Sequence, residues 1–259
     1  MITMGIDMGA KTIKVVILKD GKVAARSIVV AGFEVEKMAK EAIDQAMNEA
    51  GVAREDIEKV ISTGAGEKQA PFYDETKSVV GCDSLGAAFL HPTVRCVIDV
   101  GAEEGRGMRC DETGKILDFE VNEKCAAGAG AFTEAMSRAL EVKLEELGPL
   151  SLKATEDVPM NAQCTVFAES EVVTMVHNNV PKENMAKAVH DAMASRITSM
   201  VRKIGFEKDV VLVGGVAKNI GFVHSLNSDL GLEVIVPEEP EFVGALGAAL
   251  AAAGWKGGA

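Results

Sequence analysis

The sequence of 259 residues predicts an α/β fold built from two related lobes. Strand-like segments alternate with amphipathic helical segments along the chain, which is typical of layered α/β domains. In addition, the segment GIDMG at residues 5–9 returns as VIDVG at residues 97–101. Each copy reads as a strand, a tight turn with an acidic residue and a glycine, a second strand, and a Gly-Lys turn that opens a third strand. The repeat predicts a duplicated chain.

The remaining elements follow the same order in both halves. After the first copy we expect a helix over residues 35–50, a short strand over 59–62 and a helix over 76–90. After the second copy, whose strands lie between residues 94 and 121, we expect helices over 131–140, 165–177 and 182–204, a strand over 209–213 and a last strand near Val234. An alanine-rich helix over 243–253 closes the chain, and its small side chains allow close packing against a sheet.

Composition excludes several classes of partner. Lys and Arg number 27 against 39 Asp and Glu, so the formal charge is −12, which repels nucleic acid and anionic membranes in the absence of a basic patch. No apolar stretch reaches the roughly 18 to 20 residues that span a bilayer, and the first residues resemble a strand rather than a signal peptide. We therefore expect a cytoplasmic protein with no nucleic-acid or membrane partner.

The five cysteines show no local metal motif. Without an export signal they are expected to be reduced, and their spacing contains no CxxC pair, which argues against a self-contained zinc or iron-sulfur site. Three of them fall in a predicted helix and two predicted strands, where we assign them to packing: Cys82, Cys96 and Cys110. The histidines at 91, 177 and 190 also lack metal-site spacing, and we expect them at the surface or at helix ends.

Two glycine turns at strand ends are candidate phosphate loops. Phosphate needs backbone N–H donors that a Cβ does not block, together with a cation and a carboxylate that acts through Mg²⁺. A single turn of this kind is commonly just a hairpin, but two copies in facing lobes favour a phosphate site. The first loop supplies Asp7, Gly9, Ala10, Lys11 and Thr12, and the second supplies Asp99, Gly101, Ala102, Glu103 and Glu104.

A third glycine-rich element follows the predicted strand at 209–213. Gly214, Gly215 and Val216 lead into a helix whose first turn carries Asn219. Such a backbone can lie flat against a nucleotide base and ribose, and Asn219 could hydrogen-bond to them. The alternative is a glycine turn that serves packing alone.

In this order, the two DxG loops and VGGVAKN resemble the nucleotide-binding fold shared by actin, sugar kinases and acetate kinase. The motifs NEKCAAGAGAF, around Cys125, and NAQCTVFAESEVV, around Cys164, resemble a narrower group, the BadF/BadG/BcrA/BcrD-type ATPases. This group contains the ATPase subunits of ATP-dependent benzoyl-CoA reductases and the activators of 2-hydroxyacyl-CoA dehydratases. The resemblance extends from residue 5 to residue 249.

The resemblance implies a duplicated, two-lobed actin-like fold. The first ribonuclease-H-like lobe would span residues 1–90 and be completed by residues 241–259, and the second would span residues 91–240. Asp7 and Asp99 would act through Mg²⁺, and Glu103 or Glu104 would position water. Lys14 is either a phosphate contact, like Lys11, or part of the solvated face of an edge strand. ATP or ADP would contact residues of both loops and the glycine-rich element: Gly9, Ala10, Lys11, Thr12, Lys14, Gly101, Ala102, Gly214, Gly215, Val216, Asn219 and Gly244.

The resemblance also implies an iron-sulfur cluster. Cys125 and Cys164 from each of two subunits would hold one [4Fe-4S] cluster, and Gly128 and Gly130 would permit close approach of the helix that follows. A ferredoxin would supply the electron, ATP hydrolysis would drive its transfer, and a catalytic iron-sulfur reductase or dehydratase component would receive it. The partner in the dimer would be a related ATPase subunit or a second copy of this chain.

Two departures from the family pattern bear on the choice of function. Homodimeric activators usually carry a hydroxyl residue after the first DxG and a Gln-Asp pair in the second loop, whereas this chain has Ala10 and the pair Glu103-Glu104. The pattern favours a benzoyl-CoA reductase subunit, with a homodimeric dehydratase activator as the alternative. A sugar or acetate kinase would leave Cys125 and Cys164 without a use, and a pseudo-ATPase would bind nucleotide without turnover.

Overall fold

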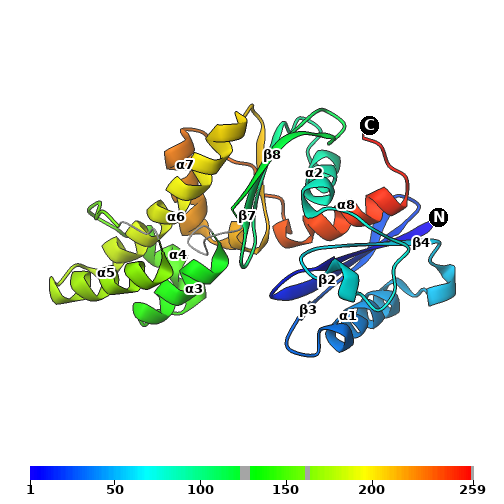
Figure 1. Cartoon of the computed structure of the whole chain (residues 1–259), viewed down its shortest axis with the longest axis horizontal. Helices are drawn as coiled ribbons and strands as arrows, with labels where there is room; N and C mark the ends of the chain where they lie inside the picture. Colours follow the sequence, from blue (N-terminus) through cyan, green and yellow to red (C-terminus); the bar gives the residue numbers. More distant parts are fainter. Residues whose placement is uncertain (123–128, 161–163, 258–259) are drawn as a thin grey trace.

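The computed structural model describes residues 1–122, 129–160 and 164–257, and it contains two mixed sheets (Figure 1). The first sheet has the order β3-β2-β1-β4-β5 and the second has the order β8-β7-β6-β9. In each sheet three antiparallel strands follow one another and a later strand joins the first in parallel. The strands are β1 (Ile2–Met8), β2 (Thr12–Lys19), β3 (Lys22–Val30), β4 (Lys59–Thr63), β5 (Glu75–Thr76), β6 (Cys96–Val100), β7 (Gly105–Cys110), β8 (Ile116–Asn122) and β9 (Val210–Val213). The predicted α/β fold and the repeat of three-stranded units are confirmed.

Helix α1 (Val35–Ala50) covers the outer face of the first sheet. Its buried residues Ala39, Ala42, Ile43 and Ala46 recur at helical spacing and pack into one cluster with the side chains of β1 and β2. The helix ends at Gly51, whose φ of 63° is the left-handed conformation that glycine adopts most easily. Apolar periodicity and this glycine predict the bounds of α1 correctly.

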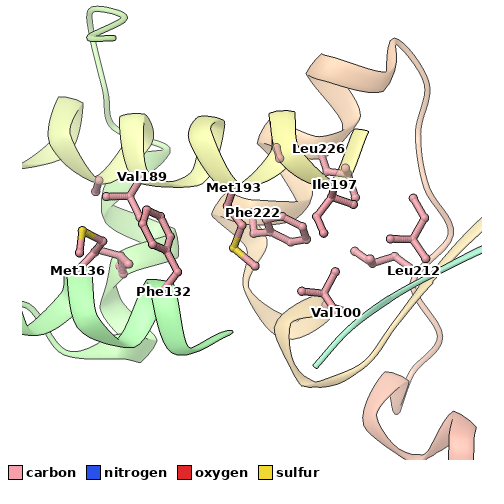
Figure 2. Packing of buried hydrophobic residues seen from close by; sticks show 14 of the residues in the cluster. Val100, Phe132, Met136, Val189, Met193, Ile197, Leu212, Phe222 and Leu226 are labelled. Atoms are coloured by element: carbon pink, nitrogen blue, oxygen red, sulfur yellow. The ribbon is translucent and has the colours of Figure 1, made fainter. Parts of the chain in front are cut away.

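The second sheet carries most of the helices, which share one large core. They are α3 (Gly130–Ala139), α4 (Leu144–Ser151), α5 (Thr165–His177), α6 (Lys182–Ile204) and α7 (Ile220–Leu230). Figure 2 shows Val189, Met193 and Ile197 on one face of α6, pointing toward side chains of α3 and α7. Phe132 of α3 and Phe222 of α7 are fully buried in this core.

Between the two sheets lie α2 (Val79–Leu90) and α8 (Val243–Ala252) (Figure 1). Both contain the sequence LGAA, at residues 85–88 and 246–249, so the repeat extends to these helices. Helix α8 packs against β1, β2 and β4, while Ala87 and Ala88 of α2 join a cluster of residues from the second sheet. We propose that this helical layer connects the two predicted lobes, 1–90 with 241–259 and 91–240.

Several element predictions need correction. The helix expected from residue 76 begins at Val79, because Ser78 caps it and residues 75–76 join the first sheet. The strand expected near Val234 is reduced to one parallel bridge between Val211 and Ile235. Helix α4 was absent from the predicted elements.

The predicted location of His190 was also wrong. This residue lies fully buried inside α6, whereas we expected it at the surface or a helix end. The other histidines named above are consistent with that expectation, because His91 caps α2 and His177 ends α5. The packing role assigned to Cys82, Cys96 and Cys110 is confirmed by their burial in α2, β6 and β7. In the described part of the chain, no helix is long and apolar enough to cross a membrane.

The contact between α2 and α8 is testable through Gly247. A methyl group added at this position would lie 1.8 Å from the carbonyl oxygen of Cys82, so Gly247→Ala forces the two helix backbones apart. We expect a loss of at least about 2 kcal/mol in the free energy of unfolding, measured by urea denaturation, despite the higher helix propensity of alanine. Gly81→Ala in α2 is the matched control, because the added methyl group meets a flexible serine hydroxyl. Equal stability of the two variants would contradict the close contact.

Candidate functional site

A cleft of about 640 Å³ lies where the ends of the two sheets meet the helical layer between them. This volume is typical of sites for small molecules and cofactors. Each predicted catalytic and nucleotide-binding residue that the structure describes lines the cleft: Asp7, Gly9, Ala10, Lys11, Thr12, Lys14, Asp99, Gly101, Ala102, Glu103, Glu104, Gly130, Gly214, Gly215, Val216, Asn219 and Gly244. Gly128 and Cys125 lie outside the described residues. The structure therefore brings the three glycine-rich elements together in one place.

The two DxG aspartates are held in the same way by strand register. Asp7 at the end of β1 lies opposite Lys14 on β2, and Lys14 Nζ donates to Asp7 Oδ2 at 2.9 Å. Asp99 at the end of β6 lies opposite Arg106 on β7, and Arg106 Nη1 donates to Asp99 Oδ2 at 2.5 Å. In both cases the cation follows its aspartate by seven residues. This offset was present in the sequence and could have identified Arg106, which the sequence analysis missed.

These pairs place two cations beside the candidate phosphate loops. Strand β2 is an interior strand and Lys14 is 14% exposed, so the alternative of a solvated residue on an edge strand is wrong. Burial opposes the charge of Lys14, but the neighbouring Asp7 carboxylate outweighs it and raises the pKa of Lys14. The pKa of Arg106 is raised in the same way, against burial, by Asp99. Both side chains are therefore charged at neutral pH.

A glycine with positive φ lies against the side chain of each aspartate. Gly64 follows β4 with φ of 94°, and Gly214 follows β9 with φ of 88°. A methyl group at either position would lie within 2.6 Å of the Oδ1 atom of the adjacent aspartate, Asp7 or Asp99. The duplicated halves therefore share the loop, its counter-ion and the glycine behind it.

Asp83 is a third aspartate in the cleft, and the sequence analysis missed it. It lies on α2, is 4% exposed, and its Oδ2 atom has no hydrogen-bond partner among the described residues. Burial raises its pKa well above the ordinary value, and the nearby charge of Asp99 adds to this effect. The LGAA repeat was the available signal, because it places Asp83 at the position in α2 that Gly244 occupies in α8.

This donor set fits a hydrated Mg²⁺ ion. In the parts of the chain that the structure describes, no three Cys, His, Asp or Glu side chains are close enough to ligate an ion directly. Mg²⁺ commonly keeps several waters and is bound through one or two carboxylates together with nucleotide phosphates. Asp7 and Asp99 at the ends of the two loops, and the unpartnered Oδ2 atom of Asp83, supply the acceptors for such an ion.

The two glutamates of the second loop have different surroundings. Glu104 forms an ion pair with Arg106, so its carboxylate is held against the pair that fixes Asp99. Glu103 is exposed on the wall of the cleft. Of the two candidates for positioning water, Glu103 therefore has the carboxylate that faces open space.

Helix α3 is attached to both loops. The backbone N–H groups of Gly130 and Ala131 donate to the carbonyl oxygens of Gly101 and Ala102, at 2.9 and 2.8 Å. On the other side, Lys11 of the first loop forms an ion pair with Glu134 of α3. Lys11, predicted to contact phosphate, thus has a carboxylate partner in this structure, and α3 spans the two loops.

Asn219 lines the cleft at the start of α7, and its side chain has little freedom. It is the N-cap of α7, where its Oδ1 accepts hydrogen bonds from the N–H groups of Gly221 and Phe222. Its Nδ2 lies 2.9 Å from Nε2 of His190. Because Oδ1 is used by the cap, Nδ2 must donate and the imidazole must accept. Burial lowers the pKa of His190 to about 4, which fits a neutral ring.

Cys164 is the described member of the predicted cluster pair. It is partly exposed and forms the N-cap of α5, so the predicted helix after this cysteine is confirmed. Free N–H groups at a helix N-terminus and the helix dipole favour a negatively charged ligand such as a thiolate-bound cluster. Helix α5 packs against α3, whose first residue lies five positions after Cys125. These features are compatible with a cluster held by Cys164 and Cys125.

Comparison with known proteins agrees with this geometry. A model of the BadF/BadG/BcrA/BcrD ATPase family matches residues 4–252. The chain is 42% identical to the activator of lactoyl-CoA dehydratase from Anaerotignum propionicum, over 96% of each chain. It is 33% identical to one of the subunits of benzoyl-CoA reductase from Thauera aromatica, over 96% of this chain and 92% of the relative.

Solved structures show the same likeness. The activator of 2-hydroxyisocaproyl-CoA dehydratase from Clostridium difficile, solved with bound ADPNP, superposes with a TM-score of 0.91 at 38% identity, covering 97% of this chain and 94% of that one. A ROK family glucokinase from Streptomyces griseus superposes with a TM-score of 0.60 at 12% identity, over 98% of this chain and all of that one, and shows the common fold alone. The actin-like and sugar-kinase-like fold is confirmed.

The neutral His190 makes a prediction about acid stability. Between pH 6.5 and about 4 the unfolded chain binds a proton at this residue that the folded chain excludes, so the free energy of unfolding falls as pH decreases through this range. Over this pH range we expect the free energy of unfolding of His190→Gln to fall by on the order of 3 kcal/mol less than that of the wild type. Urea unfolding at several pH values measures it, with exposed His224→Gln as the control. Parallel profiles for His190→Gln and the wild type would contradict a buried neutral ring.

Proposed function

Because the chain belongs to the BadF/BadG/BcrA/BcrD ATPase family, we propose that it is an ATP-dependent activator that delivers low-potential electrons to a 2-hydroxyacyl-CoA dehydratase. Its family couples ATP hydrolysis to electron transfer. Dehydratase activators are more similar to this chain than the benzoyl-CoA reductase subunit is. The comparisons therefore favour a dehydratase activator, our sequence-based alternative, over the benzoyl-CoA reductase subunit, and we propose that it is a homodimer.

The cleft supports the ATPase part of this proposal. The phosphates of ATP would lie between the two loops, where backbone N–H groups, Lys14 and Arg106 neutralise negative charge. Mg²⁺ would be held by Asp7 and Asp99 through its waters and would polarise the terminal phosphate. Glu103, with its exposed carboxylate, would orient the attacking water, while Glu104 stays paired with Arg106. The glycines before α7 would accept the adenosine.

One observation supports coupling between nucleotide binding and electron transfer. The first turn of α3 is hydrogen-bonded to the carbonyl oxygens of the second phosphate loop, and the chain immediately before α3 contains the Cys125 motif. Glu134 of the same helix is paired with Lys11 of the first loop. Movement of either loop on phosphate binding or release would therefore act directly on α3, with no intervening element.

The cluster would be held by Cys125 and Cys164 from each of two copies of the chain. When bound, it would supply a one-electron carrier of low potential. Cys164 is the N-cap of α5, so the free N–H groups in the first turn of that helix would favour the negative charge of the cluster. A ferredoxin would be the donor and the dehydratase the acceptor.

Iron content tests the cluster and the homodimer together. Anaerobically purified chain, expressed alone, should contain about four irons and four sulfides per two chains, as one [4Fe-4S] cluster requires. Cys164→Ala should lose this iron, whereas Cys110→Ala, a buried thiol in β7, should retain it. Iron that appears only after coexpression with a related subunit would instead support the heteromeric reductase. Absence of iron under both conditions would remove the cluster from the proposal.

The different surroundings of the two glutamates predict different effects on turnover. Glu103→Gln should lower kcat for ATP hydrolysis by about 100-fold, the usual loss for a group that activates water, with little change in nucleotide affinity. Glu104→Gln should have a smaller effect on kcat, because Arg106 already occupies that carboxylate. Steady-state phosphate release measures both, with exposed Glu112→Gln in the β7–β8 turn as the control. Wild-type turnover in Glu103→Gln would exclude this residue from the reaction.

A further inference from the structure

Asp83 differs from the two loop aspartates of the cleft, because it has no cation of its own. Asp7 is paired with Lys14 and Asp99 is paired with Arg106, each through a direct hydrogen bond. The Oδ2 atom of Asp83 is buried and unpartnered among the described residues. A buried carboxylate without a partner is strongly destabilising, so its retention at the wall of a ligand cleft points to a partner that arrives with the ligand.

The carboxylate of Asp83 faces the same part of the cleft as Asp7 of the first loop. A methyl group added at Gly244 would lie 2.8 Å from Oδ1 of Asp83 and 3.8 Å from Oδ2 of Asp7. Both carboxylates therefore face one region of the cleft, which the absence of a side chain at Gly244 keeps open. Gly244 was predicted to contact the nucleotide directly; its contacts indicate that it also gives Asp83 room.

An ionised Asp83 would add a negative charge that no cation in this region pairs with directly. Lys14 is paired with Asp7, and Arg106 is paired with both Asp99 and Glu104. The nucleotide brings further negative charge, so it cannot supply the missing partner. A divalent cation that enters with the nucleotide can do so, and a carboxylate that is too distant to ligate the ion can still accept hydrogen bonds from its waters.

We propose that Asp83 is a positioning residue that holds a water of the nucleotide-bound Mg²⁺ ion, so that each of the two loops and α2 contributes one carboxylate to the cation site. This inference rests on the proposed function, because it requires that Mg²⁺ and ATP occupy this cleft. It extends that function by assigning a role to α2, the helix that packs against α8 between the two sheets. Formation of the cation site would then depend on the relative position of α2 and the two loops.

The test is the affinity for Mg²⁺ in the presence of a non-hydrolysable ATP analogue, measured by calorimetric titration of the full chain. Asp83→Asn, which keeps the shape and removes the charge, should weaken Mg²⁺ binding about 10- to 100-fold, as loss of a group that orients a metal's ligands commonly does. The affinity for the analogue at saturating Mg²⁺ should change much less. Asp44→Asn, an exposed position on α1 outside the cleft, is the matched control and should bind Mg²⁺ like the wild type.

Gly244→Ala provides a second variant, which retains the Asp83 residue but crowds its side chain. Its methyl group would displace Oδ1 of Asp83, so it should also weaken Mg²⁺ binding, and Asp83→Glu should recover part of the affinity lost in Asp83→Asn. Wild-type Mg²⁺ affinity in Asp83→Asn, or a loss of turnover in that variant with unchanged Mg²⁺ affinity, would overturn the inference and leave the proposed function intact. Failure of the wild-type chain to bind the analogue with Mg²⁺ would instead contradict the proposed function itself.

Discussion

The close contact between α2 and α8 is the constraint on which the arrangement of the molecule depends. Each of these helices packs on one sheet, and their backbones approach at Gly86 and Gly247. Helix-to-helix contact at this distance requires glycine, because any Cβ at these positions would meet backbone atoms of the other helix. With the helices fixed in this way, the ends of β1 and β6 are directed to one cleft. The small residues of the LGAA repeats therefore decide where the charged loops meet.

Electrostatic balance is the second organising feature. Antiparallel pairing of β1 with β2, and of β6 with β7, places a cation opposite each loop aspartate, so protein contacts alone hold the two aspartates in place. A site whose charged groups are already oriented loses little free energy in reorganisation when a charged ligand binds. Asp83 is the exception, because its buried Oδ2 atom has no hydrogen-bond partner among the described residues.

Much of the fold could be predicted from local sequence. Periodicity predicts α1, α5 and α6 with the bounds that the structure has, because each follows from the helix's own apolar stripe or capping residues. The phosphate loops were equally accessible, since a strand followed by Asp and Gly is a local pattern. Prediction failed where a contact joins distant segments. His190 is buried because α7 brings Asn219 against it. Arg106 reaches Asp99 through strand register, and Asp83 reaches the cleft through the packing of α2.

The hydrogen bonds between α3 and the second loop also fix the direction of the loop peptides. A trans peptide points its carbonyl oxygen and its N–H group in opposite directions, so the carbonyls of Gly101 and Ala102 that face α3 turn the N–H groups of the next residues away from it. The helix thus fixes the orientation of the peptide dipoles of the loop. Linkage between two sites is reciprocal. If a bound nucleotide shifts the conformational equilibrium of α3, the same coupling free energy must therefore appear as an effect of α3 on nucleotide affinity. If the cleft binds nucleotide as proposed, a change in the position of α3 would alter nucleotide affinity as much as the nucleotide alters α3.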